Sequence, residues 1–307
     1  SGVCSDPNER APIVSILERN EAKDKGGALY VTGPSDYNFT SVSGITVHLN
    51  KANAGGGVAF VNTPRASIEA TLIDMNEARL EGGGGIYVET STLSLHVNVR
   101  VKNNMATFSE SGSGGGILIK GNITSESTVN IINDSGFSAL QLEMNNASNN
   151  GGGISILDNA VLKATPGVYP VDKGTNREYG SLSITGGRAM RKGGAIYMEK
   201  GGLFKAADAE FIMCTAGSDG GAIASSGTVE LTDSLFRDNT AGSKGGAIAM
   251  TYTNGSNVKP SLTLSKSFFS GSRAQENGGD IFASWSDVDL TEVESTDAHA
   301  AKHGGCL

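Results

Sequence analysis

The sequence is organised around a short repeat of two glycines, a small residue and an aliphatic residue. Ten copies occur, and the closest successive copies are 25 to 29 residues apart. Apolar and polar residues alternate after the glycines, as in Ile196-Tyr197-Met198, which is typical of a strand with one buried face. We expect the aliphatic residues of the ten copies to form one internal ladder: Leu29, Val58, Ile86, Ile117, Ile154, Ile196, Ile223, Ile248, Ile281 and Leu307.

A second motif precedes the glycines at a fixed distance. Phe236 is followed by Asn239 and Ala241, and the glycine pair begins at Gly245; residues 17–26 have the same spacing. Asparagine tolerates the left-handed backbone conformation and bonds to its own backbone, so we expect it at a bend. The glycines permit a tight corner with positive φ before each strand.

These repeats predict a solenoid, because one unit cannot bury its apolar face alone and stacked strands lie about 4.8 Å apart. Glycine supplies 43 of 307 residues without the period of three that collagen needs. Propeller blades need about 40 or more residues, the Leu-x-x-Leu-x-Leu frame of leucine-rich repeats is absent, and the glycine content excludes helical repeats. We predict an all-β, right-handed parallel β-helix of about ten to twelve coils, a single domain over residues 1–307 with an N-terminal arm (1–11) and an insertion loop (164–181).

The paired motifs carry a family resemblance. The FxxN and GGA(I/L/V) motifs resemble those in the passenger region of the chlamydial polymorphic outer-membrane proteins, and in related algal surface proteins, over residues 17–307. The segment from Phe236 to Ile248 is the cleanest copy. The resemblance implies a right-handed β-helix that is extracellular or exposed on a cell surface, with an adhesive or structural role.

Three cysteines lie far apart along the predicted axis. Cys4 precedes the first repeat and Cys306 lies in the last, so with about ten coils they are roughly 45 Å apart. Because a disulfide requires Cα atoms within about 7 Å, they cannot pair within one chain, and Cys214 is too far from either. Two interpretations remain open: three free thiols, or an intersubunit disulfide between Cys306 of one subunit and Cys4 of the next.

The ends of the array suggest how subunits meet. We find no capping helix, and the final glycine pair opens a further coil, which residues 1–11 of a neighbour would complete by adding a strand. A head-to-tail interface that does not close produces a filament. The competing interpretation is that the chain is part of a longer array.

Two kinds of surface site are predicted. The Asn-x-Ser/Thr triplets that are candidate N-glycosylation sites begin at Asn38, Asn122, Asn133, Asn146 and Asn254. Asn38 and Asn254 lie in polar segments expected to be loops, whereas Asn146 is expected at an inward-facing bend. Insertions in repeat arrays map to loops on one face, so the insertion loop is either a tolerated surface loop or a partner contact formed by Tyr169, Lys173, Arg177 and Tyr179.

The sequence gives little sign of chemistry. Glycoside hydrolysis needs two carboxylates across the bond, but the residue before the glycine pair alternates as Lys192, Asp219 and Lys244, which predicts a charge ladder. The glycine run at 82–85 lacks the Lys-Ser/Thr of a phosphate-binding loop, and the histidines of segment 299–303 lack a helical pattern that would suit a metal. We therefore expect no cofactor and no enzymatic activity.

The functional prediction follows from these exclusions. A net charge of −8 argues against nucleic acid as a partner. The sequence lacks a stretch of about 18 apolar residues, so we expect no membrane insertion. The leading prediction is an extracellular structural subunit that binds itself in a head-to-tail homopolymer. The first alternative is a surface adhesin that binds a host or carbohydrate ligand, with glycans or other surface proteins as partners. The second is a β-helical polysaccharide-degrading enzyme.

Overall fold

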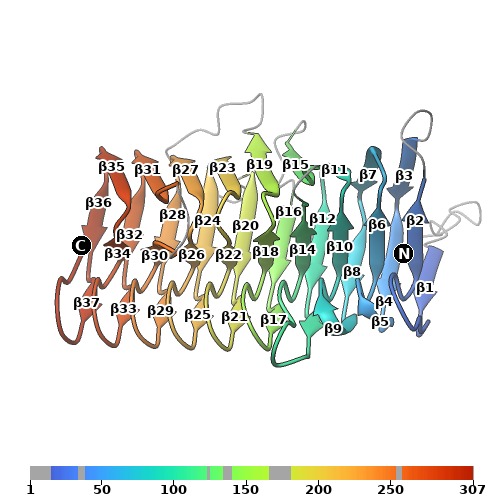
Figure 1. The fold of residues 1–307 in the computed structure, drawn as a ribbon, viewed down its shortest axis with the longest axis horizontal. Coiled ribbons are helices and arrows are strands. Elements are labelled where there is room, and N and C mark those ends of the chain that lie inside the picture. Colours follow the sequence, from blue (N-terminus) through green and yellow to red (C-terminus); the bar gives the residue numbers. More distant parts are fainter. Residues whose placement is uncertain are drawn as a thin grey trace, which may run out of the picture.

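The computed structural model describes residues 15–33, 39–122, 125–133, 140–165, 181–253 and 258–306. These residues form a straight stack of coils in which every strand pairs in parallel with its counterparts in the neighbouring coils (Figure 1). Three of the four sheets have nine strands and one has ten, so the parallel β-helix has about nine coils. The prediction of ten to twelve coils was slightly too high. The long spacings of 37 and 42 residues that follow Gly114 and Gly151 each belong to one coil, because β14, β18 and β22 pair directly.

The first two sheets contain the segments of the second motif. Sheet 1 consists of β1 (Ser15–Glu18), β4 (Ile45–His48), β8 (Leu72–Asp74), β12 (Val99–Lys102), β16 (Leu140–Glu143), β20 (Leu182–Thr185), β24 (Ala209–Ile212), β28 (Leu235–Arg237), β32 (Phe268–Ser270) and β36 (Glu294–Thr296). Sheet 2 consists of β5 (Lys51–Ala54), β9 (Glu77–Gly82), β13 (Met105–Ala106), β17 (Asn146–Ala147), β21 (Arg188–Ala189), β25 (Thr215–Ala216), β29 (Thr240–Ala241), β33 (Arg273–Ala274) and β37 (His299–Ala300).

The glycine pairs lead into the third sheet, and the fourth closes each coil. Sheet 3 consists of β2 (Leu29–Thr32), β6 (Val58–Val61), β10 (Ile86–Glu89), β14 (Ile117–Lys120), β18 (Ile154–Leu157), β22 (Ile196–Met198), β26 (Ile223–Ser225), β30 (Ile248–Thr251) and β34 (Ile281–Ser284). Sheet 4 consists of β3 (Phe39–Ser43), β7 (Arg65–Glu69), β11 (Thr92–Leu95), β15 (Thr128–Ile132), β19 (Val161–Thr165), β23 (Leu203–Ala207), β27 (Thr228–Thr232), β31 (Ser261–Ser265) and β35 (Asp287–Thr291).

The first residue of each sheet 3 strand faces the interior. From Leu29 to Ile281 these residues are register partners in successive coils. All of them except the half-buried Leu29 are 2% exposed or less. Leu307 lies outside the described residues. One aliphatic column therefore runs the length of the stack.

Each glycine of the pair meets a different constraint. Gly245 has a φ of +63°, in the left-handed region that glycine adopts without strain. A Cβ atom on Gly246 would stand 2.0 Å from the carbonyl oxygen of Gly279 and 2.6 Å from the amide nitrogen of Arg273. The first glycine is thus required by the corner and the second by the close approach of the neighbouring coil.

We expect Gly246→Ala to lower the free energy of unfolding by about 3 kcal/mol or more, because the clash is with backbone that no rotamer change relieves. The matched control is Gly44→Ala. Gly44 has a similar φ of +64° but nothing within 4 Å of its Cβ position, so only the conformational cost of about 1–2 kcal/mol applies. Urea denaturation measures both variants, and equal losses would contradict the packing role of Gly246.

Buried asparagines connect successive coils. The side-chain oxygen of Asn104 accepts hydrogen bonds from the amide nitrogen and the side-chain nitrogen of Asn76, both at 2.9 Å. Its side-chain nitrogen donates to the carbonyl oxygens of Ile73 and Lys102, both at 2.9 Å. Asn50 is bonded to Asn76 in the same way, and Asn104 is bonded to Asn145. Each amide satisfies backbone groups that the corner removes from the sheets.

The bend expected at the asparagine is present, but the asparagine itself does not adopt the left-handed conformation. Positive φ falls on the residue before it, as in Met75 (55°), Asn103 (52°) and Met144 (51°). The asparagine itself points inward with 0–1% exposure at Asn104 and Asn145, where it bonds to the neighbouring coil as well as to its own. The residue before it, which points outward at the corner, accepts the strained backbone instead.

Aromatic rings fill the interior toward the C-terminal end. Phe236 is stacked between Phe211 and Phe269, with ring centroids 4.8 and 4.5 Å away. All three rings are fully buried, and Phe204 meets Phe211 edge to face. These are the apolar positions of the second motif, so identical side chains stack because the coils keep their register.

Candidate functional site

The described cysteines have different surroundings. Cys306 is exposed in the C-terminal coil, Cys214 is buried, and neither forms a disulfide. Cys4 lies outside the described residues. Cys214 occupies an asparagine position: its amide nitrogen donates to the side-chain oxygen of Asn239 at 3.0 Å, and its Sγ lies 3.5 Å from the carbonyl oxygen of Ile184. Cys214 is therefore part of the interior.

We expect Cys214 to resist thiol reagents in the folded protein, whereas Cys306 reacts. Burial is the main cause that raises the pKa of the Cys214 thiol to about 12, so little of the nucleophilic thiolate exists at pH 8. Peptide mass spectrometry after iodoacetamide treatment, with and without urea, measures this. Labelling of Cys214 at a rate similar to Cys306 without urea would contradict it.

The structure places the described candidate glycosylation sites differently. Asn122 is exposed, whereas Asn133 is 7% exposed and its side-chain oxygen has no hydrogen-bond partner. Asn146 is exposed on β17, contrary to the inward bend expected for it; the inward residue is Asn145. Asn38 and Asn254 lie outside the described residues.

The predicted partner loop is also outside this part of the chain. Residues 166–180 are not described, and they include Tyr169, Lys173, Arg177 and Tyr179. The role of these four side chains stays a prediction.

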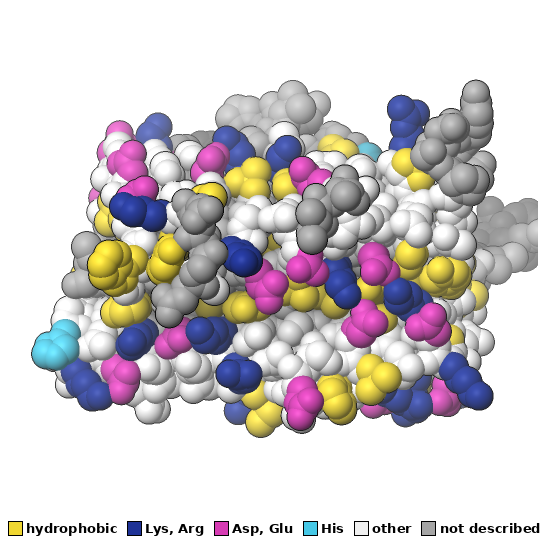
Figure 2. All heavy atoms as spheres, in the orientation of Figure 1, with side chains coloured by type: hydrophobic (Ala, Val, Ile, Leu, Met, Phe, Trp, Pro, Cys, Tyr) yellow, Lys and Arg dark blue, Asp and Glu magenta, His cyan; other side chains and the backbone are white. Residues whose placement is uncertain are grey.

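The predicted charge ladder is partly formed. Lys192 and Asp219, in successive coils, approach to 3.4 Å. Lys244, in the next coil, instead lies over the ring of Phe282, with its Nζ 4.8 Å from the ring centroid. Figure 2 shows acidic and basic side chains intermixed along this face of the rod.

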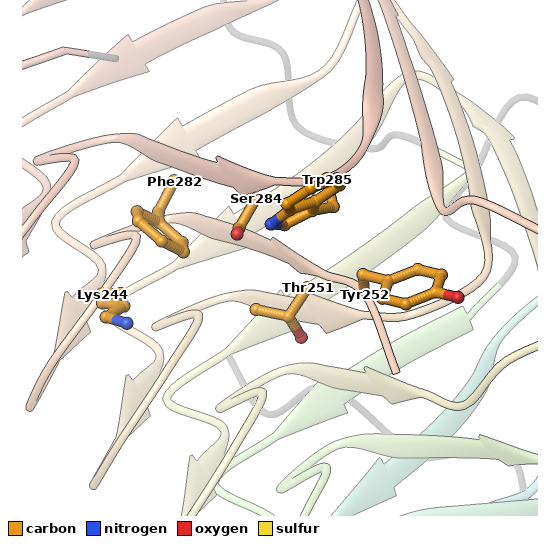
Figure 3. A pocket seen from close by; sticks show the side chains of 6 residues that line it. All are labelled: Lys244, Thr251, Tyr252, Phe282, Ser284 and Trp285. Atoms are coloured by element: carbon orange, nitrogen blue, oxygen red, sulfur yellow. The ribbon is translucent and has the colours of Figure 1, made fainter. Parts of the chain in front are cut away.

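An open cavity of about 510 Å³ lies beside Lys244 on the outside of sheet 3. Figure 3 shows the side chains that line it, which come from two adjacent coils. They are Lys244, Thr251, Tyr252, Phe282, Ser284 and Trp285. Three aromatic rings, three hydroxyls and one ammonium group are the lining expected of a small-ligand site, where apolar rings supply contact and a few polar groups fix orientation.

The requirements of the enzyme interpretation are poorly met around this cavity. Among the residues that the structure describes, those lining it include no carboxylate. Elsewhere, burial and the nearby Asp158 raise the pKa of the Glu199 carboxyl, which is the behaviour of a general acid, but Glu199 lines neither this cavity nor the one beside Val288. In the described part of the chain, no group of three or more His, Cys, Asp and Glu residues is placed to hold a metal ion.

The fold defines a β-helical repeat protein, and comparison with known proteins adds a likeness at the level of sequence. The Chlamydia polymorphic membrane protein repeat matches residues 233–251, the segment that holds the cleanest paired motif. The chain is 30% identical over 181 residues to the probable outer membrane protein pmp20 of Chlamydia pneumoniae; the match covers 56% of this chain and 10% of that protein. No solved structure matches significantly.

These findings confirm the resemblance to chlamydial polymorphic membrane proteins and support a location at the cell surface. The chain spans about a tenth of the length of the relative it matches. Among the residues that the structure describes, no helix is long and apolar enough to cross a membrane.

The aromatic cavity was missed by sequence reasoning, although a signal existed. Tyr252 and Trp285 each stand seven residues after the first glycine of their repeats, Gly245 and Gly278. Equal offsets in successive repeats place two side chains side by side in the stack. To recognise the aromatic pair from the sequence, the repeats have to be aligned through the corner after sheet 3 as well as at the glycines.

Proposed function

We propose that the protein is a structural subunit of the cell surface whose coils continue from one copy to the next, head to tail. The observation that best supports this is the uncovered interior at the C-terminal end. In β35, Val288 and Leu290 are 37% and 38% exposed, whereas their register partners Leu262 and Leu264 in β31 are 1% and 0% exposed. A cavity of about 480 Å³ opens beside Val288.

The opposite end offers a similar surface. Leu17 in β1 and Leu29 in β2 are only partly buried, whereas their register partners Val47 and Val58 are fully buried. Among the described strands, β1 and β36 each pair with a neighbour on one edge alone, and the other edge has backbone groups that a further coil would pair. Because every coil has the same apolar positions, the last coil of one copy and the first coil of another are complementary in shape and register. The exposed Cys306 would then face the first coil of the neighbour, and a disulfide to Cys4 of that copy is part of this proposal.

The test is analytical ultracentrifugation over a range of protein concentrations, with electron microscopy of the same samples. We expect concentration-dependent rods whose width is that of one coil stack. Val288→Asp places a charge on the exposed apolar end and should abolish assembly. Met144→Asp, at a corner residue that is 69% exposed far from either end, is the matched control and should assemble normally. A monomer at all concentrations refutes the proposal.

The disulfide has its own test. Non-reducing gels of the native material should show multimers that collapse on reduction and that Cys306→Ser abolishes. If rods form but non-reducing gels show no such multimers, the end-to-end stacking is supported and the intersubunit disulfide is contradicted.

The second candidate function is a surface adhesin. The observation that favours it is the side chain of Trp285, which is 80% exposed and therefore adds almost nothing to the interior. An exposed tryptophan beside other rings is characteristic of binding surfaces.

A further inference from the structure

The corner that follows sheet 3 changes character in the last two coils. Seven residues after the first glycine of each repeat, the earlier coils have small, polar or charged residues, and the last two have Tyr252 and Trp285. The residues at this place are Gly33, Asn62, Thr90, Gly121, Asp158, Lys200, Gly227, Tyr252 and Trp285.

The backbone at this corner disfavours a tryptophan. Trp285 has a φ of 54°, close to the 51° of Asn62 at the equivalent place. Asparagine and glycine tolerate this left-handed conformation, whereas a bulky side chain there is an outlier. Because Trp285 is also 80% exposed, neither local conformation nor core packing accounts for it.

The register of the two coils brings the aromatic side chains together. Thr251 and Ser284 are register partners, and the amide nitrogen of Tyr252 donates to the carbonyl oxygen of Ser284 at 3.3 Å. Tyr252 and Trp285, the next residue in each coil, are therefore neighbours along the axis. Both line the cavity with Phe282 (Figure 3).

Lys244 gives the cavity a positive charge. Its neighbours with carboxylates are engaged elsewhere: Asp219 with Lys192 at 3.4 Å and Glu276 with Lys302 at 2.6 Å. Lys244 contributes to the lowered pKa of the Glu276 carboxyl, but the hydrogen bond from Lys302 is the larger cause. Within the described ranges Lys244 makes no ion pair, and its ammonium group lies over the face of Phe282. A ligand carboxylate would therefore not have to displace an ion-paired carboxylate from Lys244.

We infer that this cavity binds a saccharide that carries a carboxylate, such as a sialic or uronic acid residue. The rings of Trp285 and Tyr252 cover the apolar face of a pyranose, the hydroxyls of Thr251 and Ser284 bond to its hydroxyls, and the ammonium group of Lys244 binds the carboxylate. A quaternary ammonium ligand, which aromatic clusters also bind, is disfavoured by the charge of Lys244. The inference rests on the adhesin function and is independent of end-to-end stacking.

The protein contains its own reporter for this site, because Trp285 is its single tryptophan. We expect 3′-sialyllactose or trigalacturonate to shift or quench the tryptophan emission in a saturable way, with a dissociation constant on the order of 0.1–1 mM. Lactose and maltotriose, which lack the carboxylate, should bind about tenfold more weakly. The response to the two acidic sugars distinguishes a sialic acid from a uronic acid. Equal binding of acidic and neutral sugars, or no response to any, overturns the inference.

Calorimetric titration of variants locates the binding. Trp285→Asn, which copies Asn62 and relieves the backbone, should fold and lose binding by more than tenfold. Lys244→Met should lose about tenfold for the acidic sugar and nothing for the neutral one. Phe39→Ala is the control, because Phe39 is 67% exposed on β3 in a distant coil. Sugar binding that survives the first two variants would keep the adhesin function and overturn this site.

Discussion

Replacement of Asn104 by alanine is expected to lower the free energy of unfolding by about 3–5 kcal/mol. The substitution removes the partners of the Asn76 amide nitrogen, of the Asn76 side chain and of the Ile73 carbonyl, all of which are bonded at 2.9 Å. A buried polar group left without a partner costs about 1–3 kcal/mol, and the methyl group of alanine supplies neither an acceptor nor a donor in place of the amide.

The measurement is the midpoint of urea denaturation at unchanged slope. Asn146→Ala is the matched control, since Asn146 is an exposed asparagine on β17; its effect should stay within about 0.5 kcal/mol. A loss at Asn104 no greater than the loss at Asn146 would show that the ladder bonds contribute nothing net.

Replacement of Phe236 by alanine is expected to cost a comparable or greater amount, about 4–6 kcal/mol. Truncation of a buried phenylalanine costs about 3–5 kcal/mol through lost burial and the cavity it leaves. The loss of two stacked neighbours, at 4.8 and 4.5 Å, adds about 0.5–1.5 kcal/mol.

Phe236→Leu separates volume from stacking, because it keeps most of the volume and should cost about 1–2 kcal/mol. Hydrogen exchange should show the coils around β28 opening first, since each coil depends on its neighbours. A Phe236→Ala variant as stable as Phe236→Leu would contradict the packing argument.

The sequence was most informative where the backbone restricts residue choice. Only glycine fits both the left-handed corner and the close contact between coils, so a glycine pair occurs at the same place in each coil. The spacing of these pairs therefore predicted the strands of sheet 3 and their register. Sheets 2 and 4 were not predicted as separate elements. Strands such as β13 and β17 have only two residues, too few for alternation to be recognised.

The sites were harder to predict than the fold for a physical reason. The second motif indicated a bend at asparagine, but the sequence suggested that Asn146 faces inward, whereas in the structure Asn145 does. Positive φ falls on the residue before the inward asparagine, which no pattern in the sequence indicated. Tyr252 and Trp285 are 33 residues apart and meet only because the coils stack in register. A site to which each coil contributes one residue leaves no pattern among neighbouring residues of the sequence.

The hydrogen bonds between coils run along the axis of the rod, so tension between its two ends loads them directly. The coil from Gly220 to Gly245 adds about 4.8 Å to the length of the rod. It holds 25 residues, which extend to about 85 Å once the coil is released. Under load the rod lengthens in discrete steps as end coils peel away, while the coils behind them stay intact. A protein built this way therefore lengthens under shear by releasing chain from its end coils, and the remaining coils keep their structure.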